Sequence, residues 1–185
     1  MKTQKENQLF TTVECARCAI CCTEPIVPVT DSDVKRICKV LNVPAQRFVR
    51  FYSIKEMEYD PDSDLWIKFP QGKRAMGLKK ALSRCLFLDN HKNCSIYNDR
   101  PMTCRTFPYV IDLDEEDNPK KVKLNKIVSC SCKKRQRSSL SEVVENVREE
   151  LNEDDSYYDK IEIWNNRKPL GTTRDFLIFI SSGEA

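Results

Sequence analysis

The stretch Cys15-Ala16-Arg17-Cys18-Ala19-Ile20-Cys21-Cys22 decides how the rest of the chain is organised, because it places four thiols within eight residues. We call it the N-terminal thiol cluster. Its C-x2-C spacing lets two sulfurs converge on one ion while the intervening turn directs backbone N–H groups at the thiolates. Successive side chains diverge, so we expect one of Cys21 and Cys22 to bind elsewhere, either a second metal or the rim of the same site. The sequence therefore predicts a metal centre to which other parts of the chain bring ligands.

The composition is that of a folded protein with one domain, or one domain with an appendage. The chain has 185 residues, of which 40% are hydrophobic and 32% are charged. Only 4 glycines and 9 prolines argue against long flexible linkers. A net charge of +3 is too small to indicate a nucleic-acid partner, and we expect none. The composition leaves the oligomeric state and the identity of any protein partner open.

The number of cysteines narrows the chemistry, because the chain has 10 of them. Such usage arises either with disulfides in an oxidising compartment or with metal in a reducing one. Residues 1–14 lack the apolar core of a signal peptide, and no run reaches the roughly 18 apolar residues of a membrane span. We therefore expect a cytoplasmic protein without membrane association, whose thiols are reduced and bind metal. A hyperthermophilic source, in which cytosolic disulfides are ordinary, is the alternative.

Apolar periodicity predicts several helices. Thr30 can cap a first helix, whose apolar face consists of Val34, Ile37, Cys38 and Leu41. On that face we interpret Cys38 as a small buried hydrophobe and not as a ligand. Pro44 suits the start of a second short helix that turns Phe48, Val49 and Tyr52 inward. The clearest amphipathic helix spans 139–152, and a last helix is expected from Thr173.

Alternating patterns and turn residues predict a few short strands. One covers residues 65–69, where Pro70 ends it. Two more, at 110–113 and 122–128, are joined by an acidic turn and should form an antiparallel pair. We expect residues 1–14 to be frayed and the basic stretch 73–80 to be a solvated connection. Together these elements predict an α+β fold.

Further cysteines follow in the second half of the chain. Cys85 and Cys94 flank a polar turn, and Cys104 lies ten residues beyond Cys94. They are too widely spaced to form a knuckle of their own, so we interpret them as distant ligands that fold back on the N-terminal thiol cluster. Cys130 and Cys132 end the second strand of the predicted pair. Without Cys38 there are nine candidate thiols, which suffice for two four-coordinate sites or for one site with additional structural or redox thiols.

The identity of the metal follows less directly from the spacing. A tight C-x2-C-x2-C run with a remote fourth cysteine is typical of a cubane 4Fe-4S cluster. Zinc sites more often combine two separate C-x2-C knuckles. We therefore predict an iron–sulfur cluster, with zinc as the alternative and a mononuclear iron site still open. His91 precedes Cys94 in an H-x2-C spacing, but we interpret it as an exposed turn residue.

Together these motifs resemble a known family, the CxxCxxCC cysteine-cluster proteins, a zinc- or iron-chelating domain of the YkgJ type. The family's "C-x-F-L" step is matched by Cys85-Leu86-Phe87-Leu88, and its "C-x-I-Y-x-x-R-P" step begins at Cys94 and ends at Pro101. The resemblance covers roughly residues 14–132. It implies a metal-binding set of eight cysteines: Cys15, Cys18, Cys21, Cys22, Cys85, Cys94, Cys104 and, by a looser match, Cys130.

Arg100 and Arg105 flank Cys104 and are the charged residues nearest to it in sequence. The interpretation that we favour is an ion pair with an acid such as Asp31, Asp33 or Asp99. In the alternative, the two arginines offset the negative charge of a thiolate cluster or bind an anionic ligand.

The fold that we predict is a small α+β domain nucleated by metal, with short antiparallel strands and a C-terminal helical extension. Residues 1–135 form the cysteine-cluster domain, and residues 136–185 form the extension packed on it. We predict a metal-binding protein that acts in electron transfer, in metal handling or as an accessory factor. One alternative is a protein (flagellin-type) lysine N-methyltransferase, an activity linked to some members of the family. Another is a structural zinc module that binds a partner protein, so whether the chain is an enzyme is left open.

Overall fold

The computed structural model describes residues 9–14, 18–23, 26–57, 60–114, 119–124 and 133–182 of the chain. No helix in these ranges has both the length and the apolar character needed to cross a membrane. The strands are β1 (Leu9–Glu14), β2 (Val49–Ser53), β3 (Ile67–Phe69), β4 (Gly72–Leu78), β5 (Lys80–Ala81), β6 (Arg84–Cys85), β7 (Tyr109–Leu113), β8 (Pro119–Leu124) and β9 (Lys133–Ser139). The helices are α1 (Ile20–Thr23), α2 (Asp31–Leu41), η1 (Ala45–Arg47), α3 (Ile54–Met57), η2 (Tyr97–Asp99), α4 (Met102–Thr106), α5 (Leu140–Asn165) and α6 (Thr173–Ser182).

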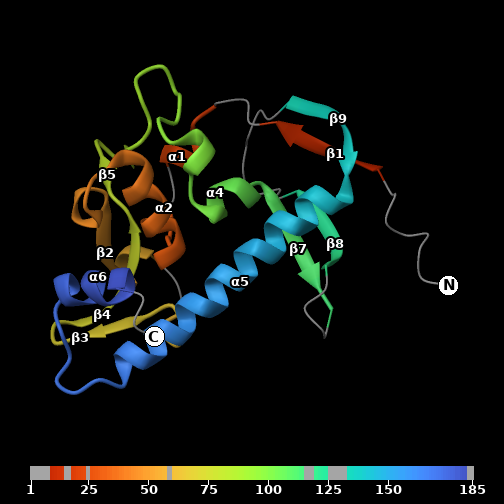
Figure 1. Ribbon diagram of the computed structural model, residues 1–185. Helices are drawn as coiled ribbons and strands as arrows, with labels where there is room; N and C mark the ends of the chain where they lie inside the picture. The colour runs from red at the N-terminus through yellow and green to blue at the C-terminus, as the bar shows by residue number, and fades with distance from the viewer. Residues whose placement is uncertain are drawn as a thin grey trace.

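A three-stranded antiparallel sheet, in the order β2-β4-β3, lies beside α2 and α6 (Figure 1). Its central strand β4 pairs with β2 through Phe51 and Met76, and with β3 through Lys68 and Lys73. The extended residues before α2 continue the β3 edge, since the Leu78 N–H donates to the Val27 carbonyl at 2.9 Å. The extended segment before α2 is therefore hydrogen-bonded to the central strand of the sheet.

Aromatic rings join α5 and α6 to the sheet. Phe176 of α6 is fully buried, and its ring centroid lies 5.2 Å from that of Trp164 and 6.0 Å from that of Phe51. Phe69 of β3 completes the contact, 6.1 Å from Phe176 and nearly perpendicular to it. Edge-to-face pairs of this kind add to the free energy gained by burying apolar area. The C-terminal half of α5 and the buried face of α6 thus contribute to the main core.

The end of α5 is also fastened to the edge strand β3 by hydrogen bonds. The Asn165 side chain accepts from the Lys68 N–H at 2.7 Å and donates to the Trp66 carbonyl at 2.9 Å. The Trp164 indole N–H donates to the Lys68 carbonyl at 3.0 Å. These bonds satisfy edge groups that would otherwise face water or another chain.

The basic stretch 73–80, predicted to be a solvated connection, is instead the central strand β4. Ala75, Met76 and Leu78 are each 2% exposed. A Cβ at Gly77 would meet the Val27 carbonyl oxygen at 3.0 Å, so glycine permits the close approach of the extended segment before α2. Lysines and arginines at the start of the strand concealed this apolar pattern from the sequence analysis.

Several helix predictions need a change of boundary. The helix expected from Pro44 is only the single 3-10 turn η1, after which β2 begins, although Phe48, Val49 and Tyr52 are buried as expected. The helix predicted at 139–152 continues to Asn165 as α5, because neither glycine nor proline interrupts residues 140–165. The helix expected from Thr173 is confirmed as α6.

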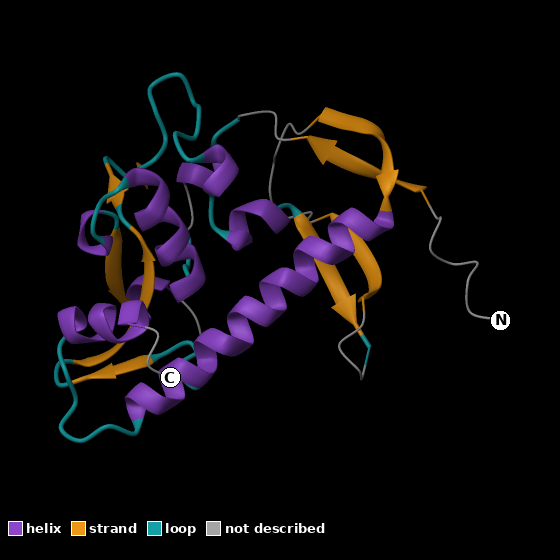
Figure 2. Cartoon of the chain, viewed as in Figure 1, coloured by secondary structure: helices purple, strands orange, loops and turns teal. Residues whose placement is uncertain are grey.

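Two antiparallel strand pairs, β7–β8 and β1–β9, lie near the N-terminal end of α5 (Figure 2). β7 and β8 form the predicted antiparallel pair, with β8 starting at Pro119 instead of residue 122. β1 pairs with β9, so residues 9–14 are a strand and not a frayed end. The α+β class with short antiparallel strands and a C-terminal helix is therefore confirmed. The predicted boundary between residues 135 and 136 falls within β9, and the division into two domains stays a prediction.

We predict that Phe176→Ala lowers the free energy of unfolding by about 3–5 kcal/mol, because it removes a fully buried ring at the junction of α5, α6 and the sheet. Urea unfolding followed by circular dichroism would measure this. The matched control is Ile178→Ala on the same helix, where the side chain is 56% exposed and the change should stay within about 0.5 kcal/mol. Equal losses in the two variants would contradict this packing.

Candidate metal centre

Helix α1, at the end of the N-terminal thiol cluster, contacts β6, where the second group of cysteines begins. Helix α1 carries Cys21 and Cys22, and β6 ends at Cys85. Both Cys22 and Cys85 are half-buried, and Cys85 packs against the edge of the hydrophobic core. Segments more than sixty residues apart in sequence are therefore neighbours in the fold. This is the approach that the predicted folding back of Cys85 requires.

Cys85 and Cys94 are linked by a tight backbone arrangement. The Cys85 carbonyl accepts from the Leu88 N–H at 3.0 Å, and Leu88 in turn forms an antiparallel bridge with Cys94. Asp89 organises the loop between them, because its carboxylate accepts from the backbone N–H groups of His91 and Asn93, both at 2.8 Å. The polar turn inferred from the sequence is thus a closed loop with a cysteine at each end.

Cys104 lies on the short helix α4, which η2 and Pro101 lead into. Arg100 links η2 to α4, since its Nε donates to the Cys104 carbonyl at 3.2 Å and its Nη1 donates to the Tyr97 carbonyl at 2.6 Å. The Arg100 guanidinium also lies over the Tyr97 ring, 4.1 Å from its centroid. Cys104 packs against the core, so α4 holds this thiol at the core boundary.

The favoured ion pairs of Arg100 and Arg105 with Asp31, Asp33 or Asp99 are not formed. Arg105 donates to the Arg100 carbonyl at 3.1 Å and to the Asn98 carbonyl at 2.9 Å, so both arginines bind backbone oxygens of their own loop. Within the part of the chain that the structure describes, no carboxylate forms an ion pair with either guanidinium. Among the described residues, the two arginines beside Cys104 are thus held by backbone oxygens, which is compatible with the alternative interpretation.

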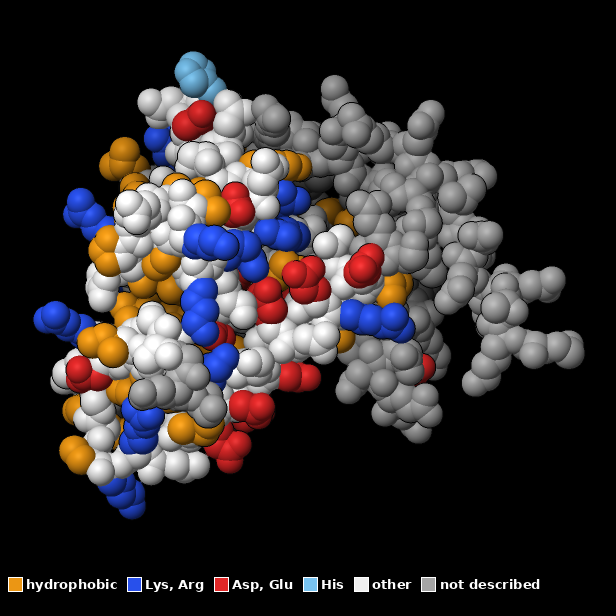
Figure 3. All heavy atoms as spheres, in the orientation of Figure 1, with side chains coloured by type: hydrophobic (Ala, Val, Ile, Leu, Met, Phe, Trp, Pro, Cys, Tyr) orange, Lys and Arg blue, Asp and Glu red, His pale blue; other side chains and the backbone are white. Residues whose placement is uncertain are grey.

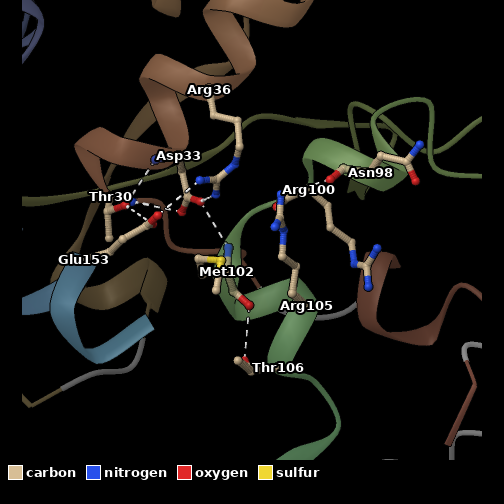
Figure 4. Close-up of polar contacts among 9 residues, drawn as sticks. All are labelled: Thr30, Asp33, Arg36, Asn98, Arg100, Met102, Arg105, Thr106 and Glu153. Atoms are coloured by element: carbon tan, nitrogen blue, oxygen red, sulfur yellow. Dashed lines mark hydrogen bonds and ion pairs between the residues drawn. The ribbon is translucent and has the colours of Figure 1, made fainter. Parts of the chain in front are cut away.

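On its other side, α4 is held by Asp33 of α2 (Figure 4). The Asp33 carboxylate is buried and accepts from the Met102 N–H at 3.0 Å and from the Thr30 N–H at 3.2 Å. Arg36 pairs with Asp33 and also with Glu153 of α5, the latter at 3.1 Å. Burial raises the pKa of Asp33 to about 6, against the lowering effects of Arg36 and the two backbone donors. One carboxylate thus connects α2, α4 and, through Arg36, α5.

More carboxylates of α5 lie close to Asp33. Acidic side chains gather along α5, with basic side chains beside them over α2 (Figure 3). Burial, together with repulsion from Glu150, Asp33 and Glu153, raises the pKa of Asp154 to about 7. Burial likewise raises the pKa of Glu150, although side-chain hydrogen bonds from Thr106 and Thr103 of α4 lower it. The contact between α4 and α5 is therefore partly a group of coupled carboxyls.

The other two sequence candidates lie where they were expected. Cys38 is half-buried on the side of α2 that faces α6, where it borders a groove with Leu177, and burial raises the pKa of its thiol. His91 is exposed at the tip of the loop between Cys85 and Cys94, where it projects from the surface in Figure 3. Neither observation assigns these residues to a metal centre.

The described cysteines alone do not complete a site. Among the residues with described side chains, no three His, Cys, Asp or Glu side chains are grouped closely enough to hold a metal ion. Cys15, Cys130 and Cys132 lie outside the described residues, as does the side chain of Cys21. A centre at the contact of α1 and β6 therefore needs ligands from these positions. Thiols are the right donors for zinc or iron, and four-thiolate sites of either metal are common.

The sequence analysis missed the role of Asp33 at α4. A Thr-x-x-Asp pattern at residues 30–33 is a capping-box signal, and the structure confirms Thr30 as the cap, with both reciprocal bonds present. No local pattern indicates that the same carboxylate binds the backbone 69 residues further along the chain. A buried acid can be identified only once the packing of α2 against α4 and α5 is known.

We predict that the protein loses stability as the pH rises from about 4 to about 7, in part through Asp154. The pKa of Asp154 is raised from 3.8 to about 7 in the folded state, so the folded protein holds this proton more tightly than the unfolded chain. The stabilisation that this proton gives the folded state is complete below about pH 4 and disappears as the pH rises through about 7. Asp154→Asn should therefore stabilise the protein at about pH 8 by on the order of 1 kcal/mol, a figure discounted for partial exposure.

Thermal unfolding of wild type and Asp154→Asn at about pH 5 and about pH 8 measures this effect. Asp155→Asn is the matched control, because it removes the same charge from the exposed neighbouring position. A pH dependence that is identical in all three proteins would show that the carboxyls are not coupled as described.

Comparison with known proteins places these features in a family. A family model described as "Putative zinc- or iron-chelating domain" (CxxCxxCC) matches residues 14–133. "Uncharacterized protein MJ0661" of Methanocaldococcus jannaschii is 31% identical over 104 residues, which are 54% of this chain and 46% of that protein. The chain thus spans less than half the length of this relative, and no solved structure gives a significant match. The matched region contains every cysteine of the predicted set, and the chain belongs to the CxxCxxCC family.

Proposed function

We propose that this protein binds a metal centre through thiolates of the N-terminal thiol cluster together with Cys85, Cys94 and Cys104. The observation that carries the proposal is the contact of α1 with β6, which brings a segment of the N-terminal thiol cluster next to the segment that ends at Cys85. The description of the family as zinc- or iron-chelating supports metal binding. The eight cysteines of the predicted set remain candidates, and Cys130 is the one whose match is loosest.

We favour an iron–sulfur cluster, and specifically 4Fe-4S, over zinc. The support is the spacing of the N-terminal thiol cluster, in which three cysteines two residues apart precede remote ones. Such a centre would supply one-electron chemistry, whereas zinc would supply structural cross-linking. A reducing compartment such as the cytoplasm would keep the thiols available. Electron transfer, metal handling or service as an accessory factor to a partner protein all follow from this chemistry.

The chain's own residues would hold and shield the centre. The turn at α1 is closed by the Cys22 N–H, which donates to the Ala19 carbonyl at 2.9 Å. Phe87 follows Cys85 and packs on Phe48 with ring centroids 5.9 Å apart, so its side chain excludes water behind the loop. Arg100 places a positive charge at the Cys104 backbone, where it would offset thiolate charge.

The test is metal and sulfide analysis after anaerobic purification, on wild type, Cys85→Ser and Cys38→Ser. Wild type should carry iron and sulfide and absorb at about 400 nm. Cys85→Ser removes a ligand, so its metal affinity should fall by more than the roughly 10–100-fold that loss of an outer-shell partner causes. Cys38→Ser changes another half-buried cysteine, on the side of α2 facing α6, and should leave metal content unchanged.

The outcomes separate the candidates. A colourless wild-type protein that contains zinc would replace the iron–sulfur assignment by a structural zinc site. Equal metal loss in Cys85→Ser and Cys38→Ser would contradict the ligand assignment. Wild-type protein without metal, or with its thiols oxidised in pairs, would overturn the proposal.

A further inference from the structure

We propose that Asp33 is a positioning residue for the metal centre, because it fixes the helix that presents Cys104. This inference rests on the proposed function, in which Cys104 is a ligand. It adds a residue that lies outside the cysteine motifs, on a different helix and 71 positions from Cys104 (104 − 33). Asp33 would act through the backbone of α4 and would not touch the metal.

Helix α4 cannot set its own position. It has five residues, far fewer than the roughly 12–15 that an isolated helix needs in water. Its N-cap is Pro101, which supplies no side-chain hydrogen bond to the first turn. The first N–H groups of a helix have no partner within the helix, so they must bind acceptors from other parts of the chain. The Met102 N–H, at the first residue of α4, is satisfied by the Asp33 carboxylate at 3.0 Å.

Asp33 can serve this purpose because it is itself held rigidly. Its side chain is 1% exposed, and it accepts from the Thr30 N–H and from Arg36 in addition to Met102. Arg36 is held in turn by Glu153 of α5, so the carboxylate is fixed from two helices. Met102 is 2% exposed, so its N–H is shielded from bulk solvent and depends on the Asp33 carboxylate for its hydrogen bond. An unsatisfied N–H at this position would be costly, so α4 would shift.

The backbone hydrogen bonds of Cys104 itself stay within its own segment. The Cys104 N–H donates to the Pro101 carbonyl and its carbonyl accepts from Arg100, so both bonds lie within the segment 97–104 and would move with it. In Figure 4, the dashed line from Asp33 to Met102 joins α2 to α4. Helix α4 also packs on α5, where Thr106 and Thr103 form side-chain hydrogen bonds with Glu150, whereas the Asp33 bond holds the backbone at the first residue of α4.

Asp31 provides a matched control within the same helix. Its side chain is also 1% exposed, and it also forms ion pairs, with Lys35 at 3.0 Å and with Lys160 at 2.9 Å. Its partners lie on α2 and α5 and not on α4. The two aspartates lie two residues apart on α2, and replacing either by alanine removes a buried carboxylate. Asp33→Ala also removes the acceptor of the Met102 N–H, whereas Asp31→Ala does not.

The experiment titrates anaerobic, metal-free protein with Co²⁺ and then displaces the Co²⁺ with Zn²⁺, in wild type, Asp33→Ala, Asp31→Ala and Asp33→Asn. Asp33→Ala should weaken Co²⁺ and Zn²⁺ binding by roughly 10–100-fold, the range found for outer-shell partners of metal ligands. It should also weaken the thiolate-to-cobalt charge-transfer band, because Cys104 is displaced. Asp31→Ala should keep the wild-type spectrum and affinity within about twofold, whatever its effect on thermal stability. Asp33→Asn retains an acceptor oxygen and should recover most of the affinity.

Each result decides between the two proposals. Wild-type protein that binds no Co²⁺ would overturn the proposed function and this inference with it. Normal binding by wild type, with equal affinity and spectrum in Asp33→Ala and Asp31→Ala, would overturn this inference alone. If Asp33→Ala does not fold, Asp33→Asn is titrated beside two further variants, Asp31→Asn and Cys104→Ser. A charge-transfer band weaker than that of Asp31→Asn, in the direction of Cys104→Ser, supports positioning even where most of the affinity is retained. A band and an affinity both identical to those of Asp31→Asn exclude it.

Discussion

The cysteine-bearing elements of this protein are too short to hold themselves in place, and the rest of the structure compensates for that. Helix α1 has four residues, β6 has two and α4 has five, all well below the length at which an isolated element is stable. Their geometry must therefore come from tertiary contacts. These contacts include α1 against β6, α4 against α5, and the bond from the first N–H of α4 to the buried carboxylate of Asp33. A ligand set built on such elements depends on residues remote from the cysteines.

The core that supplies these contacts is largely separate from the thiols. Its aromatic centre joins Phe51 and Phe69 of the sheet to Trp164 and Phe176 of the C-terminal helices, and its cysteines are only partly buried at its edge. Metal binding contributes folding free energy where it ties the chain together. In this fold we infer that it would order mainly the segment around Cys85–Cys104, since the sheet with α5 and α6 already buries its own apolar surface. We therefore expect metal to order this segment and not to nucleate the whole domain.

The sequence was most informative where the signal was local. The N-cap at Thr30, the helix from Thr173 and the antiparallel pair β7–β8 were all predicted from short-range patterns and are confirmed. The central strand β4 was missed because the charged residues at its start and Gly77 interrupt its apolar pattern. Its burial follows from its central position between β2 and β3. The bond from Asp33 to Met102 could not be predicted, since it depends on how α2 packs against α4. The cysteine motifs identified the candidate ligands but gave no information on what holds them.

Charge is distributed unequally across α4, and this bears on the chemistry of the proposed centre. On the α2 and α5 side, carboxylates such as Asp33 and Glu153 are bound by Arg36 or by backbone N–H groups. At the Cys104 end, Arg100 and Arg105 bind carbonyl oxygens and have no carboxylate partner among the described residues. A centre of several thiolates carries net negative charge, which unpaired guanidiniums stabilise and nearby carboxylates would oppose. Because Arg36 and backbone N–H groups bind Asp33, and Arg36 also binds Glu153, these two acids do not pair with Arg100 and Arg105 beside Cys104.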